Sequence, residues 1–387
     1  MTPFMRTIRA GIVGVGKIGR AQIAAVRSMA FADVAAIAMR DPERAAAMAS
    51  ELKISTHYRD YRDLVADPDV DVVHVCTPNS SHFEICKAAI VAGKAVLCEK
   101  PLTISAKESE ELLALAISRN VKTAVNFVYR HYAAIKALRD IISRGALGDI
   151  YTVHGEYLQD WLLYDSDYDW RVESSVGGAS RAMADIGSHW CDLACFLTGE
   201  KIVEVCADLA TFLPRRRRPG GRAAGRADTS GGSDGPAGAG QFAGAEPCDS
   251  ASSLVDVDTE DYGSALLRFA GGIRGCCTVS QVSAGGRTGP SIQADGSKAS
   301  AQWSYESPGL LVIRKRQEPD TILEYSDPVQ NRLQAQKAMI ESFYSALSER
   351  ASPGRERLYA DFADGHHSVE VVEAMMASSR SGHWERL

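Results

Sequence analysis

The sequence predicts a doubly wound α/β domain at the N-terminus, followed by a second domain that is rich in strands. Apolar runs of strand length alternate with helix-like stretches over the first third of the chain, which is typical of a parallel sheet covered by helices. A glycine-rich turn separates the first run from the first helix. After residue 200, short strand-like runs follow one another with turns between them.

In the first domain, the apolar runs predict strands over residues 8–13, 34–39, 70–76, 95–98 and 122–126. The segments between them predict helices over residues 20–29, 42–52, 81–92 and 105–119. The run at 70–76 is almost continuously apolar, as expected for a strand with both faces covered. In the second domain, the pattern predicts strands over residues 202–212, 262–269, 275–281, 292–294, 299–305 and 310–315, a hairpin turn over 270–273, and helices over 334–348 and 366–379.

Length and composition limit the architecture and the partners. The 387 residues exceed one ordinary core, and at roughly 150 residues per domain they suggest two domains, which we place at 1–126 and 127–387. The 43 basic and 49 acidic residues give a net charge of −6, so we expect no nucleic-acid partner. We expect a cytoplasmic protein without a membrane partner, because no apolar stretch approaches roughly 18 residues and the N-terminus lacks a signal-peptide pattern.

Two compositional features carry further expectations. The nine cysteines form no Cys-x-x-Cys pair and no cluster with ligand spacing, so we expect reduced thiols and no metal site. Residues 214–253 are rich in Gly, Ala, Ser, Pro and Arg and almost free of apolar residues, which predicts a flexible insertion in the second domain. We interpret the basic run 215–218 within it as a solvated loop rather than a site for an acidic partner.

The glycine-rich turn reads GVGKIG over residues 14–19, and it follows a strand and opens a helix. In that context it predicts dinucleotide binding, because the first glycine permits the turn, the second admits the pyrophosphate and the third lets helix and strand pack closely. The N-terminus of the helix attracts the phosphate charge. We therefore expect cofactor contacts from Gly14, Gly16, Lys17, Ile18 and Gly19.

The end of the second strand bears on the form of the cofactor. NAD enzymes place an acidic residue about 20 residues beyond the glycines, where it bonds the ribose hydroxyl. This chain has Met39 there, and Arg40 after it could pair with a 2′-phosphate. The choice between NAD and NADP stays open with a lean to NADP, because Arg40 could instead stack on the adenine and Asp41 could reach the ribose.

Two motifs follow neighbouring strands at the sheet edge where ligands bind in open α/β sheets. Residues 76–79 read Cys-Thr-Pro-Asn, and residues 98–101 read Cys-Glu-Lys-Pro. A Glu-Lys pair at this edge is either a structural ion pair or the source of a lysine charge that stabilises a developing alkoxide. Further cofactor contacts are expected from the side chains at this edge, which are Thr77, Pro78, Asn79, His82, Glu99, Lys100 and Asn126.

The segments GVGKIG, TPNSSH, GKAVLCEKP and GGASRAMADIGSHWCDL together resemble the glucose-fructose oxidoreductase, inositol dehydrogenase and rhizopine-catabolism (Gfo/Idh/MocA) family over nearly the whole chain. The resemblance implies a Rossmann domain followed by an α+β domain with a large, mostly antiparallel sheet. It also implies that Lys100, Asp185 and His189 face the nicotinamide as catalytic residues. The expected function is hydride transfer between NAD(P) and a secondary alcohol of a sugar, a sugar derivative or a cyclitol.

Residues 155–161 and 169–171 look like the levoglucosan dehydrogenase branch of that family, whose members act on sugars, anhydrosugars and cyclitols. We expect substrate contacts from Gln159 and Trp170 and a cofactor contact from Arg171. Tyr129 is a further candidate for substrate binding, with a place at the domain junction as the alternative. That branch carries an acidic residue at the position of Met39, so this difference leaves the cofactor form and the exact substrate open.

Asp185 and His189 are four residues apart at the start of an expected helix, so both side chains can point into one site. Histidine suits the role of base because its pKa lies near working pH. Lys100 could stabilise the alkoxide or act as the base itself, and Asp185 could bond the substrate or orient the imidazole. The alternative for the pair is a capping carboxylate beside a buried core histidine, and the presence of Lys100 favours catalysis.

Residues 156–173 hold six acidic residues, one arginine and five interleaved aromatic residues. Aromatic rings beside carboxylates suit a hydroxylated ring, although a solvated loop with core aromatics accounts for the same pattern. A bolder hypothesis is that the acids favour an aminated sugar or cyclitol.

The expected partner is a small polyol or sugar, and a broad sheet of the kind found in the family predicts a homodimer or homotetramer. Two other functions stay open. One is an NADPH-dependent keto-sugar reductase in biosynthesis. The other is a non-catalytic nucleotide-sensing regulator, which would lack the lysine that this chain has at position 100.

Overall fold

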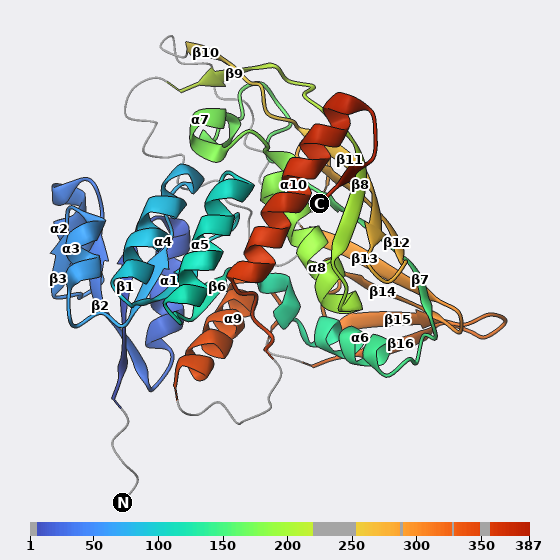
Figure 1. Cartoon of the computed structure of the whole chain (residues 1–387), viewed down its shortest axis with the longest axis horizontal. Coiled ribbons are helices and arrows are strands. Elements are labelled where there is room, and N and C mark those ends of the chain that lie inside the picture. The colour runs from blue at the N-terminus through green and yellow to red at the C-terminus, as the bar shows by residue number, and fades with distance from the viewer. Residues whose placement is uncertain (1–5, 220–252, 287–288, 327–328, 349–356) are drawn as a thin grey trace, which may run out of the picture. The chain divides into compact units, whose positions relative to one another are not determined.

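The computed structural model describes residues 6–219, 253–286, 289–326, 329–348 and 357–387. By packing, the chain divides into two units (Figure 1). The first unit contains Met1–His131 and Leu333–Val369, and the second contains Tyr132–Arg332 and Glu370–Leu387. A C-terminal segment therefore packs with the N-terminal third of the chain. The functional division at residues 126 and 127 remains our proposal.

The first unit is built on a six-stranded sheet in the order β3-β2-β1-β4-β5-β6, and every neighbouring pair is parallel. Its strands are β1 (Ile8–Val13), β2 (Ala32–Ala38), β3 (Thr56–Tyr58), β4 (Val72–Val75), β5 (Ala95–Cys98) and β6 (Thr123–Val125). The strand order reverses between β1 and β4, which is the point where doubly wound sheets bind their ligands.

Helices cover both faces of this sheet. They are α1 (Lys17–Arg27), α2 (Pro42–Glu51), α3 (Tyr61–Ala66), α4 (His82–Val91), α5 (Ala106–Ser118), α9 (Arg332–Leu347) and the start of α10 (Phe362–Ser381). Successive strand residues enter opposite cores, since Ile12 packs with α1, α2 and α9, whereas Val13 packs with α3, α4, α5 and α10. This two-sided burial explains why the strands are apolar throughout.

The second unit contains a nine-stranded sheet in the order β16-β15-β14-β13-β7-β12-β11-β8-β17. All neighbouring pairs are antiparallel except β7 and β12. The strands are β7 (Ile150–Leu158), β8 (Ile202–Ala210), β11 (Tyr262–Phe269), β12 (Arg274–Ser280), β13 (Gly289–Gly296), β14 (Ser300–Ser304), β15 (Leu310–Arg314), β16 (Thr321–Glu324) and β17 (Glu385–Arg386). The alternation along β11 buries Ala265 and Leu267 and exposes Leu266, so one face of the sheet is the core face.

Helices α6 (Ala133–Ser143) and α8 (Ser188–Thr198) lie on the core face, α6 against β14 and β15 and α8 against β7 and β13. A short helix, α7 (Ser174–Gly177), precedes a π-helical turn, η4 (Met183–Gly187), which runs directly into α8. A separate antiparallel pair is formed by β9 (Arg215–Arg218) and β10 (Ser253–Asp256).

The predicted fold class is confirmed, and the elements agree closely with the expected ranges. In the first unit the short elements β3 and α3 were missed, and α1 begins at Lys17 rather than at residue 20. In the second unit α6, β7, β16 and β17 were not predicted. The expectation of a solvated loop is wrong for the arginine run, because Arg215–Arg218 form a strand and Arg216 is completely buried. Most of the expected insertion, residues 220–252, lies outside the described residues.

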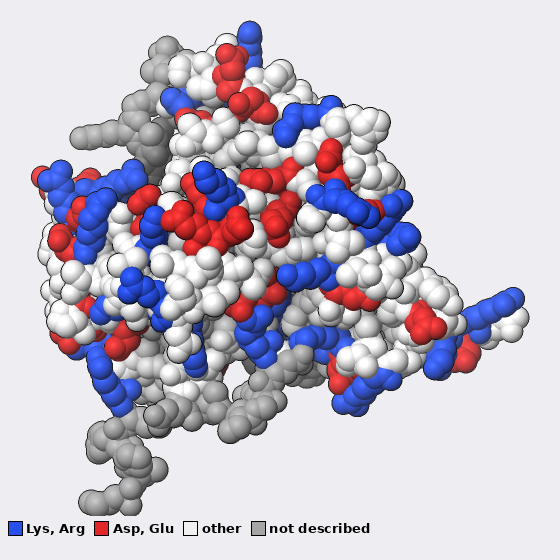
Figure 2. All heavy atoms as spheres, viewed as in Figure 1, with Lys and Arg blue, Asp and Glu red and all other residues white. Residues whose placement is uncertain are grey.

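None of the helices described is long and apolar enough to cross a membrane. On the face drawn in Figure 2, acidic and basic side chains are interspersed, in keeping with the small net charge of −6. A mixed surface of this kind gives no strong field of one sign.

Candidate active site

The turn between β1 and α1 has the backbone geometry that a bound pyrophosphate requires. Gly14 has a φ of +88°, and a Cβ on it would lie 2.8 Å from the carbonyl oxygen of Cys76. A Cβ on Gly19 would lie 2.2 Å from the carbonyl oxygen of Gly14. The N-cap residue Gly16 has no side chain to cap the first amides of α1. These residues fit a dinucleotide, whose phosphates the N-terminus of α1 would hold.

The three residues that follow β2 differ in how accessible their side chains are to a ligand. Met39 is half-buried and packs against the core on the α1 side of the sheet, while Arg40 is exposed. Asp41 caps α2, because its Oδ1 accepts hydrogen bonds from the backbone amides of Glu43 and Arg44 at 3.0 and 3.1 Å. Of these three side chains, Arg40 is therefore the most available to a ligand.

His82 joins the loops that follow β4 and β5. Its Nε2 lies 2.8 Å from the carbonyl oxygen of Thr77 and its Nδ1 lies 2.9 Å from that of Pro101. The ring is completely buried, and burial lowers its pKa more than the carbonyl contacts raise it. His82 therefore holds the two loops together, and its contact with the cofactor stays a prediction. In the loop after β4, Pro78 is exposed, and Thr77 and Asn79 are half-buried.

The Glu-Lys motif after β5 is buried, with Glu99 9% and Lys100 8% exposed. Oε1 of Glu99 accepts hydrogen bonds from the side-chain amides of Gln22 and Asn126, at 2.6 and 2.5 Å. A lysine buried at the ligand-binding edge of the sheet is a strong candidate for a functional group.

A buried polar chain behind this motif was not predicted from the sequence. Oε1 of Gln22 lies 2.6 Å from Nδ1 of His74, and Nε2 of His74 lies 2.7 Å from the hydroxyl of Tyr344 on α9. Burial lowers the pKa of His74 to about 3, so the ring is neutral at ordinary pH. The available signal was a single histidine inside the apolar strand β4, while its partners lie 52 and 270 residues away in sequence.

In the second unit, Asp185 lies in the π-helical turn η4 and His189 in the first turn of α8. Single π turns inside helices occur frequently at functional sites. Oδ2 of Asp185 accepts a hydrogen bond from Nε2 of Gln281 at 2.9 Å, and its Oδ1 lies 3.5 Å from Nε of Arg171. His189 is 2% exposed, and its ring centroid lies 6.5 Å from that of Tyr157. The carboxylate is thus oriented from two sides.

Arg171 lies in the second unit beside Asp185. Its guanidinium also pairs with Asp169 at 2.9 Å and lies 4.4 Å from the centre of the Trp170 ring. Burial lowers the pKa of Arg171, but Asp185 and Asp169 raise it more, so it lies above its ordinary value. Arg171 therefore supports Asp185, and the cofactor contact suggested by the sequence stays a prediction.

Several acids of the segment 156–173 pair with arginines. Arg217 bonds Asp165 at 3.0 Å, Arg218 contacts Glu173, and Asp169 pairs with Arg171. Much of the negative charge that suggested an aminated substrate is therefore already neutralised by the protein.

The remaining substrate candidates divide between the units. Gln159 is buried in the second unit, where its Oε1 accepts a hydrogen bond from Nε1 of Trp161 at 2.8 Å. Tyr129 is buried in the first unit, as is Lys100. In the residues covered by the structure, no group of three His, Cys, Asp or Glu side chains has the arrangement of a metal site, and the eight cysteines there are free thiols.

Comparison with known proteins identifies the family. Residues 8–127 match the model of an oxidoreductase family with an NAD-binding Rossmann fold, and residues 135–302 match the Gfo/Idh/MocA C-terminal domain. The levoglucosan dehydrogenase of Pseudarthrobacter phenanthrenivorans is 32% identical over 311 residues, which cover 78% of this chain and 75% of that protein. The chain belongs to the Gfo/Idh/MocA family. It is an NAD-binding oxidoreductase that acts on CH–OH groups.

Two further known proteins are similar to this chain. A structure of levoglucosan dehydrogenase in complex with NADH and levoglucosan has a TM-score of 0.83 and 25% identity, covering 98% of this chain and 99% of that one. A 1,5-anhydro-D-fructose reductase from Ensifer adhaerens is 33% identical over 202 residues, 51% of this chain and 59% of that protein.

Proposed function

We propose that the chain is an NAD(P)-dependent dehydrogenase that oxidises a secondary alcohol of a sugar, an anhydrosugar or a cyclitol, with Lys100, Asp185 and His189 as catalytic residues. The observation that carries the proposal is Lys100, which is only 8% exposed and follows β5 at the ligand-binding edge of the sheet. The similarity to levoglucosan dehydrogenase over three quarters of that protein supports this substrate class.

Each proposed catalytic residue has a distinct chemical role. When bound, the nicotinamide supplies the acceptor for the hydride that leaves the carbinol carbon. The imidazole of His189 takes the hydroxyl proton, and the charge of Lys100 stabilises the alkoxide that forms. The carboxylate of Asp185, oriented by Gln281 and Arg171, accepts a hydrogen bond from a substrate hydroxyl. Lys100 is the alternative base.

Two variants distinguish the bases. With His189 as the base, His189→Asn removes the acidic limb of the pH profile of kcat, whereas Lys100→Met lowers kcat without removing that limb. With Lys100 as the base, Lys100→Met removes the acidic limb, whereas His189→Asn lowers kcat without removing it. Both variants are to be assayed as the holoenzyme with a saturating concentration of the polyol.

The substrate is a neutral polyol rather than an aminated one. The aromatic rings of segment 156–173 suit the apolar face of a sugar ring, and arginines pair with Asp165, Asp169 and Glu173. A panel of neutral sugars, inositols and their aminated analogues tests this point. Preferential turnover of the aminated analogues would contradict it.

NADP is the preferred form of the cofactor in this proposal. The exposed Arg40 at the end of β2 is available to a 2′-phosphate, and Met39 provides no acid for a ribose hydroxyl. Replacement Arg40→Ala should lower kcat/KM for NADP about tenfold and leave that for NAD nearly unchanged. A wild-type preference for NAD would refute this assignment and favour an oxidative, catabolic role.

Two alternatives have specific tests. A keto-sugar reductase is favoured by the likeness to a 1,5-anhydro-D-fructose reductase, and it requires faster turnover of a ketose with NADPH than of its alcohol with NADP. A nucleotide-sensing regulator would bind NADH and turn over no member of the panel.

Location and assembly complete the proposal. A cytoplasmic location is supported by the free thiols among the described cysteines, which fit a reducing compartment. A homodimer or homotetramer is supported by the open face of the nine-stranded sheet, where Leu266 is 53% exposed. Light scattering of the purified chain and of Leu266→Lys tests the assembly.

A further inference from the structure

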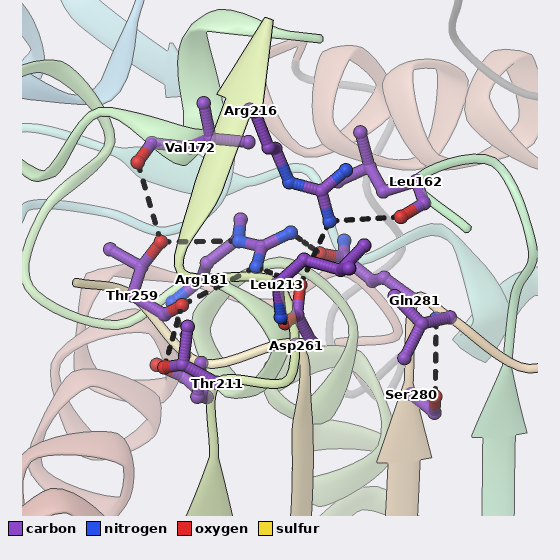
Figure 3. A network of polar contacts seen from close by, with 12 residues as sticks. Leu162, Val172, Arg181, Thr211, Leu213, Arg216, Thr259, Asp261, Ser280 and Gln281 are labelled. Atoms are coloured by element: carbon purple, nitrogen blue, oxygen red, sulfur yellow. Dashed lines mark hydrogen bonds and ion pairs between the residues drawn. The ribbon is translucent and has the colours of Figure 1, made fainter. Parts of the chain in front are cut away.

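A completely buried charge cluster lies in the second unit (Figure 3). Its centre is Asp261, just before β11. Oδ1 of Asp261 accepts hydrogen bonds from Arg181 and, at 2.9 Å, from Arg216, while Oδ2 accepts one from the amide of Leu213 at 2.8 Å. Neither guanidinium nor the carboxylate has any exposure to solvent. One carboxylate therefore fixes two arginines that come from distant parts of the chain.

Gln281 connects this cluster to Asp185. Its Oε1 lies 3.4 Å from Nη1 of Arg181, and its Nε2 donates to Oδ2 of Asp185 at 2.9 Å (Figure 3 shows Gln281 and Arg181). Arginine can only donate and the carboxylate can only accept, so the orientation of the amide is determined by its two neighbours. The backbone amide of Gln281 also donates to the carbonyl oxygen of Asp261 at 2.9 Å. Gln281 is thus held at both its main chain and its side chain.

Arg216 connects the same cluster to segment 156–173. Its guanidinium donates to the carbonyl oxygens of Leu162, Tyr164 and Asp167 at 2.8, 2.8 and 3.0 Å, in addition to Asp261. One rigid planar group therefore fixes the main chain of three residues of the segment. Lysine carries the same charge but cannot reproduce these bonds, because its donors leave a single nitrogen atom.

Neighbouring arginines of β9 extend this attachment. The amide of Arg217 donates to the carbonyl oxygen of Asp165 at 2.8 Å, and its side chain bonds the carboxylate of the same residue. Arg218 contacts Glu173. Arg215 lies on the outer side of the strand and bonds the exposed Asp256 of β10. Arg216, Arg217 and Arg218 therefore bind the segment, whereas Arg215, among the described residues, bonds only the neighbouring strand.

We propose that Gln281 is a positioning residue for Asp185, and that Arg216 sets the placement of segment 156–173 relative to Asp185 through their shared partner Asp261. The strand that carries the arginine run is, in consequence, a determinant of substrate specificity. This inference rests on the proposed function in one respect, namely that Asp185 contacts the substrate.

The first test compares variants of Gln281 that separate its two bonds. Gln281→Glu keeps the acceptor for Arg181 but loses the donor to Asp185, and Gln281→Leu loses both. We expect both to lower kcat by about 100-fold on whichever of levoglucosan and myo-inositol the wild-type chain oxidises faster. Gln293→Leu is the matched control, since this glutamine lies on β13 and bonds Asp295. Wild-type kcat in Gln281→Glu would overturn the proposal.

A double-variant cycle in stability tests the same bond without turnover. Gln281→Leu and Asp185→Ala should be coupled in the urea midpoint, and Gln281→Leu should cause no further loss of kcat in the Asp185→Ala background, because alanine has no acceptor for Nε2 of Gln281. Absence of coupling would refute the inference. Coupling together with full activity of Asp185→Ala would instead refute the proposed function, so the two failures are distinguishable.

The second test compares two adjacent arginines. Arg216→Lys should speed hydrogen exchange in segment 156–173 and change the ratio of kcat/KM for levoglucosan and myo-inositol by at least fivefold. Arg215→Lys, on the exposed side of β9, should change neither. Equal behaviour of the two variants in both measurements would overturn the role of Arg216.

Discussion

Replacing Asp261 by asparagine tests how strongly the buried cluster stabilises the second unit. The substitution preserves the shape of the side chain but removes the charge that both Arg181 and Arg216 share. It also places an amide donor where the carboxylate accepts bonds from these arginines and from the amide of Leu213. All three charged side chains are completely buried, so water cannot take over the lost interactions.

The expected loss is about 4 kcal/mol, because removing one partner of a buried ion pair costs about 3–5 kcal/mol. With a slope of about 2 kcal/mol per molar urea, the unfolding midpoint should fall by about 2 M. This loss is a large part of the roughly 5–15 kcal/mol that holds a folded domain.

Tryptophan fluorescence reports this transition selectively. All five tryptophans, Trp161, Trp170, Trp190, Trp303 and Trp384, belong to the second unit. Asp256→Asn is the matched control, since Asp256 is 89% exposed and pairs with Arg215 at the surface, where ion pairs contribute little. If Asp261→Asn shifts the midpoint no further than Asp256→Asn does, the cluster does not stabilise the unit and our reasoning is refuted.

Two further predictions concern the first unit. Gly19→Ala should weaken NADH binding at least tenfold in a fluorescence titration, because the new Cβ would lie 2.2 Å from the carbonyl oxygen of Gly14. The control Ala24→Ser, on the exposed side of the same helix, should bind NADH with the wild-type Kd. An unchanged Kd for Gly19→Ala would contradict the role assigned to this turn. The pKa of His74 lies at about 3 in the folded chain, against 6.5 ordinarily. Between pH 6.5 and pH 3, His74 is therefore protonated in the unfolded chain but neutral in the folded chain. The stability from neutral His74 is complete above about pH 6.5 and falls by up to about 1.4 kcal/mol per pH unit as the pH drops towards 3. Urea titrations followed by circular dichroism at pH 7 and pH 5 should show this slope, and an identical slope in His74→Gln would assign it to other groups.

The sequence predicted the first unit well because its physical signals are local. Strands covered on both faces are apolar throughout, and the GVGKIG turn stands between the first strand and its helix. The missed strand β3 has only three residues, Thr-His-Tyr, and gives no periodicity that could be recognised. Length, rather than the type of element, limited the prediction there.

The candidate site was predicted in part. The motifs identified Lys100, Asp185 and His189 as candidates, but the π-helical turn at Asp185 and its two supporting residues were not foreseen. The role of Gln281 depends on a contact across 96 residues, which no local pattern reveals.

The arginine run was predicted wrongly, because its burial also depends on contacts that are distant in the sequence. Four consecutive charges predicted solvation, yet alternation along a strand turns Arg216 inward and Arg215 outward. Burial of Arg216 depends on Asp261, which is 45 residues away in the sequence.

The central claim is that Lys100 takes part in hydride transfer from a polyol. The most direct measurement is the rate of reduced-nucleotide formation at 340 nm by the wild-type chain and by Lys100→Met, with NADH affinity measured on both proteins. We predict turnover of at least one sugar or cyclitol, a loss of about 1,000-fold or more in kcat for Lys100→Met, and NADH binding within about threefold of wild type. Turnover by Lys100→Met within tenfold of wild type would contradict the claim, as would tight NADH binding by a wild-type chain that oxidises no polyol.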